Sequence, residues 1–295
     1  MTEYKVQGGL VFTRTQNQDW KQVEFYPSPN GGQTIKPRYL IIHYTAGSGG
    51  PHQIAAYFQK SSAKASAHLN LGVDGELTQN MGLEKKAWHA GKSSWAGLTN
   101  LNNHSIGIEV CNPGPLTITS KGYKSWFGKY YDDDSIIEGP HPNNPNGPVY
   151  GWLPFTNEQM TVLTTLGQAI MEEYNLIETL GHDMISPGRK TDPGLCMNHR
   201  VYDVLNNPLD DDPEDEKGRA IYDWFVSAAP HLNGRSGPGT THDVILKLNQ
   251  GDEIDIIERK GVWWFVETAT GQQCWVHSKF LRMKSLERRM KKDPL

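Results

Sequence analysis

Residues 181–194, GHDMISPGRKTDPG, gather side chains that can do chemistry in one short segment. His182 comes near its start, and Lys190 and Asp192 follow a predicted Pro-Gly turn. Imidazole nitrogens and carboxylate oxygens are common ligands of zinc. A polar surface loop has a similar composition, so the segment by itself is only a candidate metal site.

A catalytic zinc usually has three protein ligands and an open position for water, so His182 and Asp192 are one ligand short. The best candidate for the third is His43, at the end of the apolar run YLIIHY and just before a glycine-rich loop. His68 and His89 stay in the pool, because residue type alone does not rank them below His43. The ligands would meet only if the strand that ends near His43 is a neighbour of a second predicted strand, IETLG.

Two further residues would complete a hydrolytic site. The alternation of SIGIEV, residues 105–110, predicts a strand with Glu109 on the face opposite its three aliphatic residues. Beside a metal, Glu109 would accept a proton from water, and protonated Lys190 would stabilise negative charge on a carbonyl oxygen. The set predicts a metal-assisted amide hydrolase. The alternatives are that Glu109 pairs with a lysine and that the histidines are structural.

Length and composition limit the classes of protein. The chain has 295 residues and a formal net charge of -4, which predicts two domains and gives no reason to expect a nucleic-acid partner. Its short apolar runs predict no membrane span, and three scattered cysteines predict buried, reduced thiols rather than a disulfide framework. The N-terminus lacks an apolar segment of signal-peptide length, so we expect a protein made in the cytoplasm.

The remaining elements suggest an α/β domain followed by a β domain. Residues 68–81 predict a hairpin around Asp74-Gly75, and residues 157–174 predict a helix that covers the sheet, with a capping box from Thr156 and Gln159. Its expected apolar stripe is Met160, Leu163, Leu166, Ile170 and Tyr174. Residues 112–155 are interpreted as a long loop, either a wall of a binding cleft or an insertion packed by its own aromatic residues. After the acidic run at 210–216, short apolar segments from about residue 231 predict a small β-barrel.

Five motifs, in this order along the chain, resemble the zinc-dependent N-acetylmuramoyl-L-alanine amidases of type 2, the AmpD-like and peptidoglycan-recognition family. They are IIHYTAG at 41–47, SAHLNLGVDGELTQ at 66–79, AWHAGKS at 87–93, NHSIGIEV at 103–110 and the segment 181–194. The resemblance implies a mixed central sheet flanked by helices. It also implies that His43, His182 and Asp192 bind Zn²⁺, with Glu109 and Lys190 as catalytic residues.

The same resemblance assigns Tyr44, His68, Trp88 and His89 to substrate binding or to support of the ligands. Cys196 is interpreted as structural. Residues 232–281 resemble the bacterial SH3-like domain, which implies a module that binds the cell wall. Trp263, Trp264 and Trp275 are candidates for its binding surface, and at least one of them is expected in its core.

These expectations give four segments: an amidase domain at 1–206, an acidic linker at 207–228, an SH3-like domain at 229–284 and a basic tail at 285–295. The expected activity is hydrolysis of the amide between N-acetylmuramic acid and L-alanine in peptidoglycan. A non-catalytic wall sensor and a zinc peptidase are the alternatives. A phage endolysin released through a holin and a secreted effector with an immunity protein both fit a wall-acting enzyme without a signal peptide.

Overall fold

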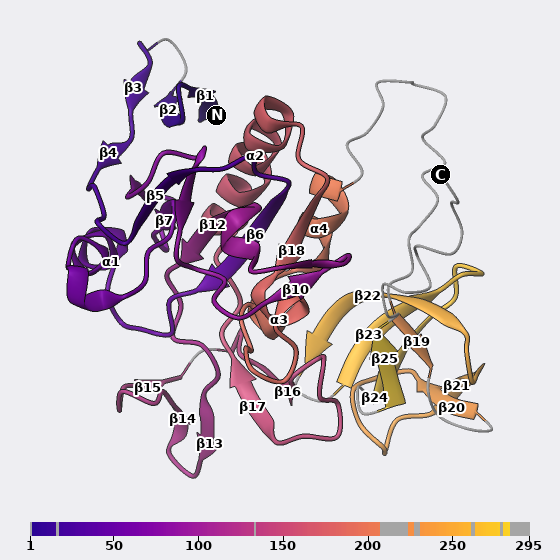
Figure 1. Ribbon diagram of the computed structural model, residues 1–295. Coiled ribbons are helices and arrows are strands. Elements are labelled where there is room, and N and C mark those ends of the chain that lie inside the picture. The colour runs from indigo at the N-terminus through magenta and orange to yellow at the C-terminus, as the bar shows by residue number, and fades with distance from the viewer. Residues whose placement is uncertain are drawn as a thin grey trace. The chain divides into compact units, whose positions relative to one another are not determined.

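The computed structural model describes residues 2–15, 18–132, 134–206, 224–226, 231–260, 263–277 and 280–283. The chain divides into two compact units (Figure 1). Unit 1 comprises residues 1–132 and 153–210, and unit 2 comprises residues 133–152 and 211–295. The acidic run at 210–216 and the basic tail at 285–295 lie outside the described residues.

A six-stranded mixed sheet forms the centre of unit 1, with the strand order β18-β6-β12-β7-β8-β4. The strands are β4 (Glu24–Phe25), β6 (Tyr39–Tyr44), β7 (Leu69–Leu71), β8 (Leu77–Gln79), β12 (Ser105–Val110) and β18 (Glu178–Gly181). The first four strands in this order are parallel, and β8 is antiparallel to β7. All six residues of β6 are buried, as expected for a central strand of a largely parallel sheet. The predicted α/β fold with a mixed sheet is confirmed.

The predicted β-hairpin is the β7–β8 pair. Gly75 in its turn has φ 85°, a left-handed conformation that glycine adopts without strain. Besides the long helix α2, described next, the helical segments of unit 1 are short. They are α1 (Pro51–Phe58), α3 (His182–Ile185), α4 (His199–Asn206), η1 (Ser61–Ala63), η2 (Leu101–Asn103) and η3 (Gly194–Cys196).

Helix α2 (Asn157–Tyr174) has the predicted bounds and runs alongside the sheet in Figure 1. Its capping box is present: the Thr156 hydroxyl accepts a hydrogen bond from the Gln159 amide at 3.1 Å, and the Gln159 side chain accepts one from the Thr156 amide at 3.0 Å. The buried face differs from the predicted stripe. Val162 is buried, whereas Met160 and Tyr174 are only partly buried, because the helix also packs on β1 (Glu3–Gln7) and α4.

Smaller sheets surround the central one. They are β1 with β2 (Leu10–Arg14) and β3 (Lys21–Gln22), β5 (Gly31–Thr34) with β9 (Lys85–Ala87), and β10 (Ser94–Trp95) with β11 (Leu98–Thr99). A further antiparallel sheet consists of β13 (Thr117–Thr119), β14 (Gly122–Lys124) and β15 (Tyr130–Tyr131). The prediction of a long loop at 112–155 is therefore wrong. Strands of two to four residues between turn residues are too short to show a clear hydrophobic alternation.

Unit 2 contains the pair β16 (Ile137–Pro140) and β17 (Val149–Trp152) and a seven-stranded antiparallel sheet of order β21-β20-β24-β23-β22-β19-β25. The seven strands are β19 (Trp224–Val226), β20 (His231–Arg235), β21 (Val244–Asn249), β22 (Glu253–Lys260), β23 (Trp263–Thr268), β24 (Gln273–His277) and β25 (Leu281–Met283). The expected β domain is confirmed. Strand β19 falls within the segment predicted as linker, because its apolar run Trp-Phe-Val pairs with β22 and β25.

Core residues agree with two smaller predictions. Trp264 is 3% exposed and belongs to the core of unit 2. Cys111, Cys196 and Cys274 are buried free thiols. Among the described residues, no helix combines the length and the apolar character needed to cross a membrane.

Candidate metal and hydrolase site

Strand pairing brings the predicted residues together at one end of the central sheet. In the parallel pair β18–β6, Gly181 lies opposite Ile42, so the next residues, His182 and His43, are neighbours. In the parallel pair β12–β6, Glu109 lies opposite His43. The carboxyl ends of these strands therefore supply the site.

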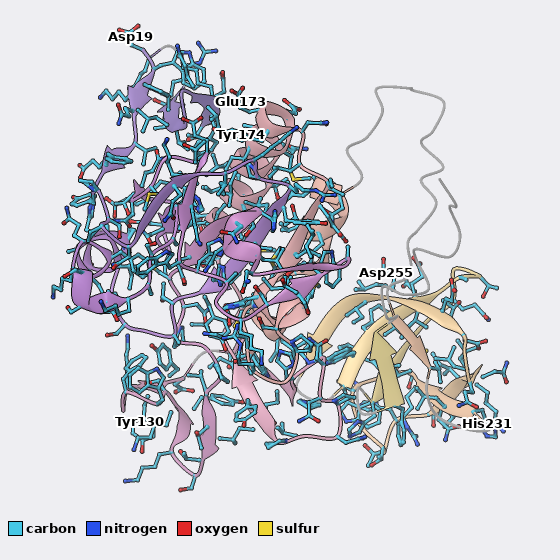
Figure 2. All side chains as sticks on the ribbon, in the orientation of Figure 1. Asp19, Tyr130, Glu173, Tyr174, His231 and Asp255 are labelled. Carbon is cyan, nitrogen blue, oxygen red and sulfur yellow. The ribbon has the colours of Figure 1, made fainter. Side chains whose placement is uncertain are left out.

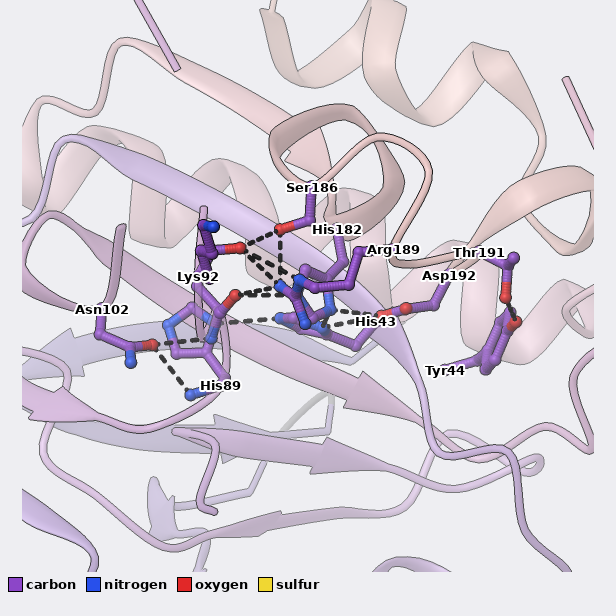
Figure 3. Close-up of polar contacts among 11 residues, drawn as sticks. His43, Tyr44, His89, Lys92, Asn102, His182, Ser186, Arg189, Thr191 and Asp192 are labelled. Atoms are coloured by element: carbon purple, nitrogen blue, oxygen red, sulfur yellow. Dashed lines mark hydrogen bonds and ion pairs between the residues drawn. The ribbon is translucent and has the colours of Figure 1, made fainter. Parts of the chain in front are cut away.

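Three ligand atoms converge at this edge (Figure 3). The Nδ1 atoms of His43 and His182 are 2.9 Å apart, and each is 2.9 Å from Asp192 Oδ2. The three residues are 1%, 2% and 6% exposed. A hydrogen bond of 2.7 Å from the Asp183 amide to the Asp192 carbonyl joins the two ends of the loop and keeps Asp192 beside His182.

The hydrogen bonds behind His43 determine which of its nitrogens carries a proton. Ser105 Oγ donates to the Leu101 carbonyl at 2.6 Å, so it accepts from His89 Nε2 at 3.3 Å. His89 Nδ1 is then unprotonated and accepts from His43 Nε2 at 3.0 Å. His43 Nδ1 is therefore left with a free lone pair directed into the site.

The same reasoning applies to His182. Its Nε2 lies 3.0 Å from the Ala90 carbonyl, which can only accept, and 3.3 Å from Arg189 Nη2, which can only donate. The shorter contact assigns the proton to Nε2, which leaves Nδ1 without one. Two bare nitrogens and a carboxylate oxygen then face one another without a proton between them. Such a set is repulsive unless a cation lies among them, and two imidazoles with one carboxylate are a typical donor set for zinc. The residues fit a zinc ion.

The electrostatics of the cluster agree with these proton positions. Burial, together with the nearby His182, lowers the pKa of His43 to about 4, so the imidazole is neutral at pH 7. Burial alone would raise the pKa of Asp192, but its interactions with the adjacent imidazoles of His182 and His43 outweigh burial and hold that pKa well below its usual range. The site offers a neutral His43 imidazole and an ionised carboxylate, the forms that bind a metal.

Glu109 and Lys190 interact electrostatically with two of the three candidate ligands. Burial, and then the charge of Asp192, raises the pKa of Glu109 to about 8, while the charge of Lys190 lowers it. Within the described part of the chain, Glu109 Oε2 is enclosed and has no hydrogen-bond partner. Lys190 is partly buried, and its charge also lowers the pKa of His43. A carboxyl group of this kind can exchange a proton near neutral pH.

Comparison with known proteins identifies the family. Residues 33–195, more than half of the chain, match the family model described as N-acetylmuramoyl-L-alanine amidase. This chain belongs to that amidase family. Residues 230–282 match the model of the bacterial SH3 domain, as the sequence predicted.

Individual relatives cover parts of the chain. The amidase domain is 31% identical over 147 residues to 1,6-anhydro-N-acetylmuramyl-L-alanine amidase AmpD of Citrobacter freundii, a match covering 49% of this chain and 59% of AmpD. It is 33% identical over 173 residues to N-acetylmuramoyl-L-alanine amidase AmiD of Escherichia coli, covering 55% of this chain and 51% of AmiD. The chain thus spans little more than half the length of these curated relatives. A solved selenomethionine derivative of AmpD is 26% identical, with a TM-score of 0.43, over 62% of this chain and 93% of that chain.

The other predicted residues of the amidase site differ in their access to solvent. Trp88 is 36% exposed and can reach a substrate, whereas Tyr44 is 8% exposed and its hydroxyl bonds Thr191, next to Asp192. His68 is fully enclosed. Its Nδ1 accepts from the Gly107 amide at 2.9 Å and its Nε2 donates to the Lys85 carbonyl at 2.7 Å. Both ring nitrogens are therefore already hydrogen-bonded inside the protein. The predicted direct contact between His68 and a substrate does not fit this geometry.

Two supporting residues of the amidase site were missed by the sequence reasoning. Arg189 Nη2 donates to the carbonyls of Ala90 and Lys92 at 2.9 and 2.8 Å, which joins the 181–194 segment to the loop after β9. Asn102 Oδ1 accepts from the amides of His89 and Ala90 at 3.0 and 2.7 Å. Arg189 stands inside the motif and could have been noticed, but nothing in the sequence around Asn102 indicates its role.

We expect His89→Ala to weaken zinc binding about 10- to 100-fold, because His43 loses the partner that orients it. Competition with a chromophoric chelator measures the affinity. His89→Asn, whose carbonyl oxygen can accept the same proton, should recover part of it. In Gly107→Ala the new Cβ would lie 2.5 Å from His89 Nδ1, so this variant should also bind zinc more weakly. Wild-type affinity in both His89→Ala and Gly107→Ala would contradict the role of His89.

Proposed function

We propose that this protein is a zinc-dependent amidase that hydrolyses the bond between the lactyl group of N-acetylmuramic acid and L-alanine in peptidoglycan. One observation carries the proposal. Two bare imidazole nitrogens and Asp192 Oδ2 converge next to a carboxyl group, Glu109, whose Oε2 has no hydrogen-bond partner among the described residues. The names of the relatives AmpD and AmiD, both N-acetylmuramyl-L-alanine amidases, support the same bond.

In this proposal His43, His182 and Asp192 hold the zinc. The ion would polarise the scissile carbonyl and lower the pKa of the attacking water. Glu109 accepts a proton from that water and delivers it to the alanine nitrogen as the carbon–nitrogen bond breaks. Lys190 stabilises the negative charge that develops on the carbonyl oxygen. The products are a free lactyl carboxyl group and a peptide with a free amino terminus.

We also propose distinct roles for the four residues around this centre. Trp88 contacts the substrate, because its side chain remains partly open to solvent. Tyr44 lies beside the metal site, because its hydroxyl forms a hydrogen bond with Thr191, the residue before Asp192. Its ring limits the space next to Asp192. His89 and His68 act as supports, since their ring nitrogens are engaged with His43, Ser105, Gly107 and Lys85.

The SH3 domain suggests that the enzyme acts on intact wall. On one face of β23 and β24, Trp263 lies opposite His277 and Phe265 lies opposite Trp275, and all four side chains are only partly buried. The ring centroids of the two pairs are 5.4 and 5.3 Å apart. We propose this aromatic face as the wall-binding surface. Of the predicted tryptophans, Trp263 and Trp275 belong to it and Trp264 does not.

Product analysis tests the activity. Purified sacculi treated with the protein and zinc should release stem peptides that begin with a free L-alanine amino group, as mass spectrometry would show. Cuts between amino acids of the stem or cross-bridge would instead indicate a peptidase. Binding to sacculi without any released peptide would indicate a sensor. Chelation of the metal should stop peptide release, and added zinc should restore it.

The proposed place of action is the cell wall. Release with a holin, as for an endolysin, and delivery by a secretion machine are the two routes we propose to test. In the second case we expect an immunity protein as a partner in the producing cell. Deleting candidate immunity genes and scoring lysis of the producer distinguishes the two routes.

A further inference from the structure

The β13–β15 sheet and its connecting turn carry exposed aromatic rings. We call residues 117–131 the aromatic insert. Trp126 is 76% exposed and Tyr130 is 46% exposed, and Figure 2 shows Tyr130 at the margin of unit 1. Each of the two rings has a neighbouring side chain next to it. Phe127 packs edge-on against Trp126 at 5.7 Å between centroids, and the Lys124 ammonium lies 5.5 Å from the Tyr130 ring. The insert holds large flat surfaces in contact with water.

The insert is joined directly to the loop that follows the candidate ligand His43. Trp126 Nε1 donates a hydrogen bond of 2.6 Å to the Ala46 carbonyl. Ala46 is three residues after His43, a separation that a chain spans in at most about 11 Å. A Cβ on Gly114, three residues before the insert, would lie 3.0 Å from the Tyr44 ring. Trp126 is therefore fixed at one edge, next to the site, while most of its surface stays exposed.

A hollow of about 250 Å³ lies between the insert and this loop, and its lining is more apolar than polar. The polar groups at it include the hydroxyls of Ser48 and Tyr131 and the ammonium of Lys129. The Lys129 ammonium lies 5.0 Å from the Tyr131 ring, which orders both side chains at the rim. The insert thus combines exposed aromatic rings with a hollow able to form hydrogen bonds.

We propose that the aromatic insert binds the sugar rings that flank the muramic acid at which the enzyme cuts. This inference rests on the proposed function. A pyranose ring has an apolar face of C–H groups and a rim of hydroxyls, so it can pack on an indole face while its hydroxyl and acetamido groups form hydrogen bonds. The scissile amide is attached directly to a sugar of the glycan strand. Neighbouring sugars therefore leave the site over the surface around it, where Trp126 lies, and Tyr130 follows further along the same insert.

The experiment compares two substrates for each variant. One is purified sacculi, and the other is a soluble N-acetylmuramoyl peptide with a single sugar. We expect Trp126→Ala to lower the rate on sacculi relative to the rate on the single-sugar substrate by about three- to tenfold. Trp126→Phe, which keeps an aromatic face, should lower it less. Tyr130→Ala is a second variant at an exposed position, with the same expected direction. Tyr57→Ala, an equally exposed aromatic residue on α1, is the matched control.

Direct binding supplies the second measurement. In full-length protein with ¹⁵N-labelled tryptophan, the indole signal that is lost in Trp126→Ala should shift when peptide-free glycan strands are added. An unchanged ratio of rates in both Trp126→Ala and Tyr130→Ala overturns the inference, as does an indole signal that responds to free stem peptide but not to glycan. If the proposed function fails instead, wild-type protein releases peptide from neither substrate, while the indole signal still reports whether glycan binds.

Discussion

Glu109→Gln should retain zinc and lose about 10²- to 10⁴-fold in peptide release from sacculi. The amide is nearly the same size as the carboxyl group, but it cannot accept a proton from water and return it to the leaving nitrogen. The converging nitrogens of His43 and His182 are untouched, so zinc content by elemental analysis should equal that of the wild type. Glu76→Gln, at an exposed carboxylate bonded to His52, is the matched control and should keep full activity.

The same variant changes the dependence of stability on pH. The pKa of Glu109 is raised from 4.5 to about 8 in the folded, metal-free protein, so the folded state holds this proton to higher pH than the unfolded chain does. The contribution of this proton to the free energy of unfolding is fully present below about pH 4.5, and it is lost as the pH rises to about 8. In thermal melts of metal-free protein, Glu109→Gln should therefore raise the melting temperature relative to the wild type more at about pH 8.5 than at about pH 5.

Two results would contradict this role for Glu109. Turnover near the wild-type rate would remove the residue from the acid/base step. Loss of zinc together with activity would instead make it part of the metal site. The pH dependence of the melts separates either outcome from a general loss of structure, because a misfolded variant would melt at a lower temperature at both pH values.

Asp192→Asn should lower zinc affinity at least about a hundredfold and abolish activity at limiting zinc. The substitution removes the negative charge that offsets the metal, and it leaves His43 and His182 with their bare Nδ1 atoms 2.9 Å apart. Zinc stabilises any folded state that binds it, so added zinc should raise the melting temperature of the wild type much more than that of the variant. Asp132→Asn, at an exposed carboxylate that is not one of the three candidate ligands, is the control.

Excess zinc provides a further check on Asp192. If the residue is a ligand, a high zinc concentration should restore part of the activity of Asp192→Asn, because occupancy follows affinity. Normal affinity with no activity would instead place Asp192 in the reaction itself. Equal responses of the wild type and the variant to zinc, in both melting temperature and turnover, would remove Asp192 from the metal site.

The sequence predicted the elements whose local signals were strong. YLIIHY, the Asp74-Gly75 turn and the Thr156 cap each have a pattern that a few neighbouring residues determine, and each agrees with the structure. The predictions failed where strand pairing decides. The short strands of the 112–155 segment exist because they pair with one another, and strand β19 exists because it pairs with β22 and β25. Such pairing is not visible in a run of three residues.

For the site, residue types and family motifs were enough to nominate His43, His182, Asp192, Glu109 and Lys190. Spacing could not show that they meet, since 139 residues separate the two histidines. The pairing of β6 with both β18 and β12 brings His43 beside His182 and opposite Glu109. The hydrogen bonds of His89, Ser105 and Ala90 then expose the two Nδ1 lone pairs.

The sequence by itself therefore determined which chemical groups are available and which local elements carry them. These depend on side-chain chemistry and on backbone preferences over a few residues. Only the tertiary structure decided the pairing of strands, the proton positions on the imidazoles and the place of the aromatic insert beside the site. Each of these depends on contacts between residues far apart in the chain, which form only when the whole domain packs.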